Sequence, residues 1–139
     1  HPGLQLSAED KTRIEEAVAA VGLDGLEDRL PESVSGGERQ RAALARCLCQ
    51  DRAVLLLDEP FNNLDPALRH EMRSLVDRLR RERCLTVLLV SHNPEEAAEI
   101  ADTALFMHGG QILERGNLEE LLKRPRTSQL THYLGQSRE

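Results

Sequence analysis

The sequence predicts an α/β protein whose mostly parallel sheet is flanked by helices. Two short, continuous apolar runs, Val54–Leu57 and Leu85–Val90, are typical of parallel strands that are covered on both faces. Segments with the helical spacing of apolar residues precede and separate these runs, which is the alternation that builds a parallel sheet. Because such crossovers are right-handed, we expect the two strands to lie side by side or nearly so.

The first two predicted helices each begin behind a serine. Ser7 is expected to cap a helix over Ala8–Val21, with Asp10 at the position that completes a capping box. Ser35 stands before a second helix, predicted to run from residue 37 to about residue 49. The inward face of this second helix is predicted to hold Ala43, Leu44, Cys47 and Leu48.

Pro66 opens a third predicted helix, which ends near Arg83. The apolar residues of this helix form one stripe: Leu68, Met72, Leu75, Val76 and Leu79. After the second strand, the sequence predicts a short helix, two strands and a small helix, at residues 95–101, 103–107, 111–114 and 117–122. The polar segment from Arg124 onward is expected to be loosely ordered.

Composition excludes some classes of function. The 139 residues suffice for one domain. A formal net charge of -6 opposes the broad basic face of nucleic-acid-binding proteins, and an aromatic share of 2% leaves few rings on which bases could stack. No nucleic-acid partner is therefore expected. Three cysteines without a C-x-x-C pair indicate buried thiols in a reducing compartment.

The start of the second helix is a candidate phosphate site. Ser35, Gly36 and Gly37 place several backbone N–H groups without intrahelical acceptors at the positive end of the helix dipole, which favours a phosphate oxygen. The glycines let the backbone approach a ligand closely. The same residues also fit an ordinary serine-capped helix with a flexible entry.

Two adjacent acids follow the first predicted strand. Asp58 and Glu59 lie at its carboxyl end, the edge at which open α/β sheets bind ligands. Neighbouring side chains of a strand point to opposite faces, so the two acids could divide their roles. The first could hold Mg²⁺, directly or through water, and the second could orient or deprotonate an attacking water. Alternatively, both acids only stabilise nearby helix N-termini.

Two further candidates lie beside the strands. His92 follows the second strand at the same edge, where it could donate a hydrogen bond to a γ-phosphate or serve as a helix cap or core residue. Asp65 stands between the paired acids and Pro66, where it could simply cap the third helix.

Taken together, four ordered segments resemble the signature, Walker B, D-loop and H-loop motifs of ABC-transporter ATP-binding subunits: Val34–Glu38, Leu55–Pro60, Asn62–Asp65 and Val90–His92. The resemblance extends from about Ser7 to Leu122. It implies a partial P-loop NTPase fold with part of the helical subdomain of that family. In this interpretation residues 1–50 carry the signature within the helical subdomain, residues 51–123 belong to the catalytic α/β core, and residues 124–139 form a polar tail.

The resemblance also implies ATP and Mg²⁺ as ligands and a head-to-tail homodimer, in which each nucleotide lies between the P-loop of one subunit and the signature of the other. Glu38 stands where glutamine is usual, a change that is conservative because backbone N–H groups do the binding. The resemblance implies that Ser35, Gly36 and Gly37, with the adjoining Glu38, bind the γ-phosphate in trans. It implies that Asp58 holds the water shell of Mg²⁺ and that Glu59 is the general base. It also implies that His92 contacts the γ-phosphate and that Asp65 links the two sites across the interface.

Relatives of this kind are importer subunits at the cytoplasmic face of the bacterial inner membrane. Their partners are transmembrane permease subunits and, indirectly, a periplasmic or lipoprotein substrate-binding protein that delivers a small molecule. Within the family, residues 30–31, 39–48 and 65–72 are most similar to the ATP-binding subunits of bacterial thiamine importers. Spermidine-, iron- and sulfate-type importers remain open as alternatives.

The sequence holds no G-x-x-x-x-G-K-[ST] loop, and the Q-loop glutamine and the adenine-stacking aromatic of the family have no counterparts in it. We therefore expect that the isolated chain does not hydrolyse ATP. A central strand absent from the sheet would also uncover the flank of Val54–Leu57. Two other hypotheses are a head fragment of a DNA-repair or chromosome-organising ATPase and a non-catalytic remnant that offers only a partner surface.

Overall fold

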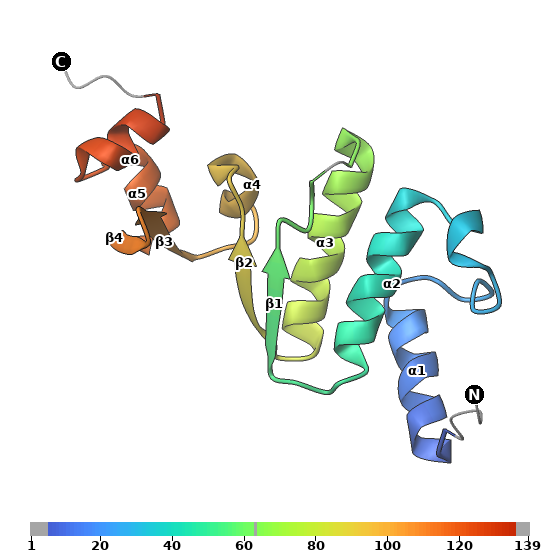
Figure 1. The fold of residues 1–139 in the computed structure, drawn as a ribbon. Coiled ribbons are helices and arrows are strands. Elements are labelled where there is room, and N and C mark those ends of the chain that lie inside the picture. The colour runs from blue at the N-terminus through green and yellow to red at the C-terminus, as the bar shows by residue number, and fades with distance from the viewer. Residues whose placement is uncertain (1–5, 63, 136–139) are drawn as a thin grey trace. The chain divides into compact units, whose positions relative to one another are not determined.

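The computed structural model of the chain describes residues 6–62 and 64–135 (Figure 1). Its contacts divide into two compact units, which meet in sequence between Val90 and Ser91. The first unit contains α1 (Ala8–Ala20), the 3-10 helix η1 (Pro31–Ser33), α2 (Gly36–Leu48), β1 (Val54–Asp58), α3 (Pro66–Glu82) and β2 (Thr86–Val90). The second contains α4 (Pro94–Ala98), β3 (Thr103–His108), β4 (Gln111–Asn117), α5 (Leu118–Lys123) and α6 (Ser128–Tyr133).

The parallel pairing that the sequence predicted is confirmed. β1 and β2 are adjacent and parallel, in a register that runs from Val54 opposite Thr86 to Asp58 opposite Val90. α3 is the crossover between them, and Figure 1 shows it lying along the two strands with α2 on its other side. The α/β fold class is therefore the one expected from the alternation of apolar runs and helices.

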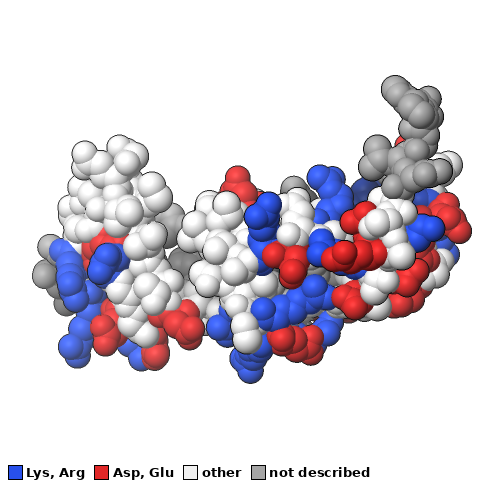
Figure 2. All heavy atoms as spheres, turned by 90° about the horizontal axis from the view of Figure 1, so that it is seen from below, with Lys and Arg blue, Asp and Glu red and all other residues white. Residues whose placement is uncertain are grey.

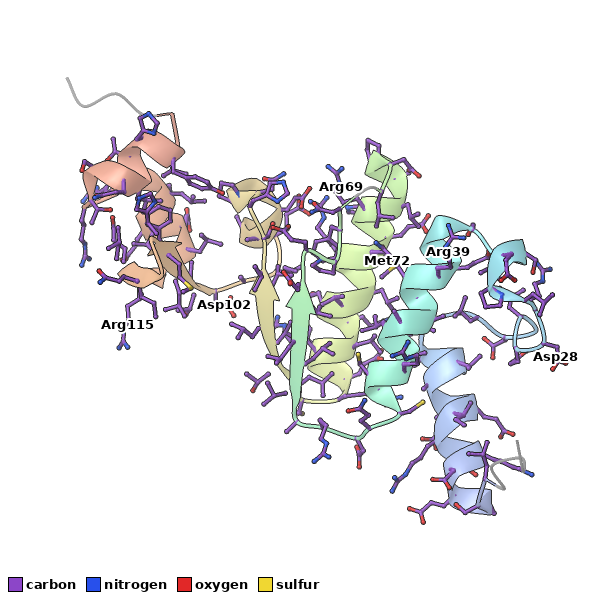
Figure 3. The ribbon with its side chains drawn as sticks, viewed as in Figure 1. Asp28, Arg39, Arg69, Met72, Asp102 and Arg115 are labelled. Atoms are coloured by element: carbon purple, nitrogen blue, oxygen red, sulfur yellow. The ribbon has the colours of Figure 1, made fainter. Side chains whose placement is uncertain are left out.

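Helices α2 and α3 supply half of the buried apolar residues described in the first unit. On α3 the innermost residues are Met72, Val76 and Leu79, each no more than 3% exposed, and Figure 3 labels Met72 on the side of α3 that faces α2. The buried residues of α2 are Gly37, Leu44, Ala45 and Leu48. The prediction that Ala43 and Cys47 also face inward was wrong, because this stripe follows positions i, i+7, i+8 and i+11 from Gly37.

The expectation that both strands are covered on both faces was also wrong for the part of the chain that is described. Leu55 is 6% exposed, whereas the alternate residues of both strands are half exposed or more: Val54 53%, Leu56 67%, Leu88 51% and Val90 52%. We call these four residues the open sheet face. The thiols differ from expectation too, because Cys47 and Cys84 are exposed and Cys49 is partly exposed.

The second unit is built on an antiparallel hairpin. β3 and β4 pair from Thr103 opposite Asn117 to His108 opposite Gln111. Gly109 and Gly110 form the two-residue turn, with φ values of 56° and 77° that a type I′ turn requires and that glycine adopts without strain. These are the two strands that the sequence predicted, and each is longer than expected.

Part of the segment expected to be loosely ordered is helical. α6 begins at Ser128, is capped by Thr127, and buries Leu130 and Thr131. Its start is tied to β4 by Glu114, which is 6% exposed and accepts hydrogen bonds from the N–H groups of Arg126 at 3.1 Å and Thr127 at 2.7 Å and from Thr127 Oγ1 at 2.5 Å. We call this arrangement the Glu114 clamp.

Candidate functional site

We call residues 35–38 the signature turn, and they begin α2 with a reciprocal capping box. Ser35 Oγ accepts the N–H of Glu38 at 3.2 Å, and Glu38 Oε2 accepts the N–H of Ser35 at 2.6 Å. The hydrogen bond from the Ser35 backbone is the main reason why the pKa of Glu38 is lowered, with that from its hydroxyl second. The Glu38 carboxylate thus shapes the turn, and the N–H groups of Gly36 and Gly37 lie in a first helical turn that provides them with no acceptor.

The two glycines of the turn have different surroundings. A Cβ at Gly36 would meet nothing within 4 Å, so this position leaves the end of the helix open to a ligand. A Cβ at Gly37 would lie 2.6 Å from Cδ2 and 2.7 Å from Cδ1 of Leu68 in α3. Gly37 is therefore required for close packing between α2 and α3, a purpose that sequence reasoning did not assign to it.

The two adjacent acids end the first strand. Asp58 is the last residue of β1 and is exposed, whereas Glu59 is partly buried and lies beyond the strand. The Glu59 N–H donates to the Val90 carbonyl at 2.9 Å, and its φ of 47° is in the left-handed region. The predicted alternation of side chains along the strand therefore does not extend to Glu59. Asp51 and Cys84 adopt the same conformation, so the surrounding chain imposes it at several non-glycine positions.

The loop from Glu59 to Asp65 is held at several points. Phe61 is 2% exposed and anchors the loop in the core, although nothing in the sequence pattern singled it out. Arg69 Nη2 donates to the Leu64 carbonyl at 3.0 Å (Figure 3). Asp65 caps α3, because its Oδ1 accepts the N–H groups of Ala67 at 3.1 Å and Leu68 at 3.0 Å. The capping reading of Asp65 is therefore confirmed, and its role across a subunit interface stays a prediction.

These contacts join the signature turn to the start of α3. Leu68 contacts the backbone of α2 at Gly37, and its own N–H is bound by Asp65. Gln40, one turn further along α2, donates from Nε2 to the Asn62 carbonyl at 3.5 Å. The signature and the loop after the paired acids are thus parts of one packed assembly within the first unit.

His92 belongs to the second unit and lies in a capped turn. Ser91 Oγ accepts the N–H of Asn93 at 3.0 Å, and Asn93 Oδ1 accepts the N–H of Glu96 at 3.3 Å at the start of α4. Asn93 rather than His92 therefore caps that helix, and the His92 side chain is exposed. The carbonyl of His92 accepts a hydrogen bond from the hydroxyl of Tyr133. Sequence reasoning missed Tyr133, because α6 was not predicted.

The donor set fits Mg²⁺ only in part. The described residues include no group of three or more His, Cys, Asp or Glu side chains placed to hold a metal ion. Asp58 alone would contribute a protein oxygen, and the remaining ligands would be water and phosphate. This is the way in which Mg²⁺ usually binds beside nucleotides, through one or two carboxylates. Asp58 therefore fits the ion as a companion of a bound nucleotide.

Comparison with known proteins agrees with the resemblance. The family model described as "ABC transporter" matches residues 2–62. An ATP-binding cassette of an ABC transporter, solved in its ADP conformation, has the same fold with a TM-score of 0.82 and 21% identity, over 95% of this chain and 53% of that one. The chain is thus similar to ABC transporter ATP-binding domains, through the family model over residues 2–62 and through its curated relatives.

Its curated relatives are more specific. It is 49% identical to the thiamine import ATP-binding protein ThiQ of Brucella abortus biovar 1 (strain 9-941), over 99% of this chain and 57% of that protein. It is 51% identical to the protein of the same name from Yersinia pestis, over 88% of this chain and 52% of that protein. The chain thus spans about half the length of the curated relatives it matches. Among the described residues, no helix is long and apolar enough to cross a membrane.

Proposed function

We propose that this chain is the signature-bearing and catalytic-base portion of the ATP-binding subunit of a bacterial importer, with thiamine as the transported molecule. The observation that carries the proposal is the position of Glu59, which lies directly after Asp58 at the carboxyl edge of the parallel pair and whose N–H donates to the Val90 carbonyl. We infer the transported molecule from the names of the relatives at 49% and 51% identity, which are thiamine import proteins.

In the proposed reaction, Glu59 accepts a proton from the water that attacks the γ-phosphate of ATP. Bound Mg²⁺ supplies charge neutralisation at the phosphate oxygens, and Asp58 holds it, directly or through water. The N–H groups at the start of α2 and the Ser35 hydroxyl face the nucleotide of a second subunit and stabilise charge that develops on its γ-phosphate. His92 donates a hydrogen bond to the γ-phosphate in its own subunit.

The proposed partners follow from the same interpretation. A second ATP-binding subunit pairs head to tail with this one, the permease subunits bind the pair at the cytoplasmic face of the inner membrane, and a substrate-binding protein acts through them. Acidic and basic side chains are interspersed over the face seen in Figure 2, which is consistent with a protein partner rather than a nucleic acid. The open sheet face supports a further part of the cassette as a neighbour.

The test is a chimera in which the preceding portion of the Brucella abortus relative is joined to this chain. We expect the chimera to hydrolyse ATP and the 139-residue chain alone to show no turnover. Glu59→Gln should lower kcat by at least about 100-fold, the loss typical of a removed general base. Glu120→Gln, an exposed change in α5, is the control and should leave the rate unaltered.

Two results would overturn the proposal: undiminished hydrolysis by the Glu59→Gln chimera, or hydrolysis by the chain alone that depends on Glu59.

The same chimeras test which molecule is transported. A bacterial strain that lacks its own thiamine-import ATP-binding subunit should take up labelled thiamine when it carries the chimera, and should not when it carries Glu59→Gln. Hydrolysis without thiamine uptake in that strain would contradict thiamine as the cargo.

A further inference from the structure

The one tyrosine of the chain connects α6 to the loop after β2. The Tyr133 hydroxyl donates to the carbonyl of His92, which lies 41 residues earlier and in the same unit. The Tyr133 ring packs against Phe106 of β3, with 5.6 Å between centroids and 46° between planes. One face of this side chain is therefore fixed by the hairpin while its polar end reaches the His92 loop.

Helix α6 is held in place without Tyr133. The Glu114 clamp binds the residues just before its first turn, and the Thr127 hydroxyl accepts the N–H of Leu130 at 3.4 Å. Leu130 is 4% exposed and Thr131 is 5% exposed. The helix is thus anchored at its start and through its apolar side, so it presents the Tyr133 hydroxyl at a defined position.

The peptide group between His92 and Asn93 is bound at both of its polar atoms. Its carbonyl accepts from Tyr133, and its N–H donates to Ser91 Oγ at 3.0 Å. Because a peptide group is planar, binding both atoms restrains its plane and, with it, rotation about the Cα–C bond of His92. That rotation is one of the two that set the direction of the His92 Cα–Cβ bond, so the Tyr133 hydroxyl restrains the point from which the imidazole leaves the backbone.

We propose that Tyr133 is a positioning residue that orients His92 for its γ-phosphate contact, so that α6 takes part in ATP hydrolysis although it touches no nucleotide. This inference rests on the proposed function, in which His92 acts on the γ-phosphate. Loss of the hydroxyl should impair the chemical step rather than nucleotide binding, because the ring and its contact with Phe106 remain.

The test compares Tyr133→Phe with Ser128→Ala in the active chimera. Tyr133→Phe should lower kcat by roughly three- to tenfold, the effect of one lost hydrogen bond, and should leave KM for ATP within about twofold. Ser128→Ala removes a hydroxyl from the same helix, where its partner is the neighbouring Gln129, and should change neither constant. In a His92→Ala background Tyr133→Phe should have no further effect, because it acts through His92.

Hydrogen exchange on the 139-residue chain gives a readout that needs no activity. Tyr133→Phe should speed exchange at residues 91–93 while exchange in α6 stays unaltered, which separates loop release from unfolding. The proposal is overturned if kcat and loop exchange both match the parent, or if the effects of Tyr133→Phe and His92→Ala on kcat multiply. Failure of the proposed function would appear differently, as an active Glu59→Gln chimera.

Discussion

Gly36 and Gly37 show how two identical neighbours can have different requirements. A Cβ at Gly36 would lie in open space, whereas a Cβ at Gly37 would lie within 2.7 Å of both methyl carbons of Leu68. A side chain at Gly37 would therefore overlap α3 before it met any ligand. The glycine pair of the signature is accordingly explained by two needs, an accessible helix end at the first position and contact between two helices at the second.

This difference predicts the stability of two alanine variants. Gly37→Ala should lower the free energy of unfolding by about 1 to 2 kcal/mol, because the Leu68 side chain has to leave its rotamer to make room. Gly36→Ala should be neutral or slightly stabilising, because alanine favours the helix and meets no neighbour. Urea unfolding followed by circular dichroism measures both. Adding Leu68→Ala should remove most of the further loss that Gly37→Ala causes, and equal loss with and without Leu68 would contradict the packing explanation.

At the scale of elements, the Glu114 clamp determines whether α6 forms. Burial by itself would raise the pKa of the Glu114 carboxyl, but the hydrogen bonds from Thr127 and Arg126 outweigh burial and lower it. A carboxyl whose pKa is lower in the folded state stabilises that state when it is ionised. The ionised Glu114 carboxyl therefore contributes to the free energy of unfolding above the pKa of glutamate in the unfolded chain, about 4.3. This contribution is lost as the pH falls through the lower pKa of the folded state.

We therefore expect α6 to detach in acid before the hairpin does. At pH 7, Glu114→Gln should destabilise the second unit by about 2 kcal/mol, because a neutral amide oxygen accepts these hydrogen bonds more weakly than the ionised carboxylate does. It should also flatten the dependence on pH below about 4.3. Hydrogen exchange of the amides of Arg126 and Thr127 across this pH range measures the effect. Glu119→Gln, the control, breaks an exposed pair with Lys123 and should leave stability unaltered.

The same elements show what local patterns can predict. The helices with long apolar stripes and a clear cap, such as α3 behind Asp65 and Pro66, and the parallel pair were all visible in the sequence. α6 was not, because its first turn depends on a carboxylate 13 residues earlier, and such a contact leaves no local pattern. The left-handed φ of Glu59 was missed for a similar reason, since the chain around it rather than its residue type imposes it.

Over the whole molecule, the open sheet face is the largest departure from the burial that the sequence predicted. Val54–Leu57 reads as a fully covered strand, yet Leu56 is 67% exposed. An apolar run of this kind is typical of a strand with a layer on each side, and the described residues supply α3 on one side only. The relatives are nearly twice as long as this chain, so they hold residues outside the matched part that can cover the second side.

The open sheet face leads to a prediction about association. The chain on its own should self-associate with increasing concentration, because association of two such faces removes their apolar side chains from water. Leu56→Glu combined with Leu88→Glu should shift it toward the monomer in sedimentation experiments, and should abolish ATP hydrolysis by the chimera because the same face then cannot be covered. The control is Leu30→Glu, since Leu30 is 70% exposed but precedes η1 and lies outside the sheet. It should change neither measurement. A chimera that hydrolysed ATP at full rate with both glutamates in place would show that nothing in the chimera packs on this face.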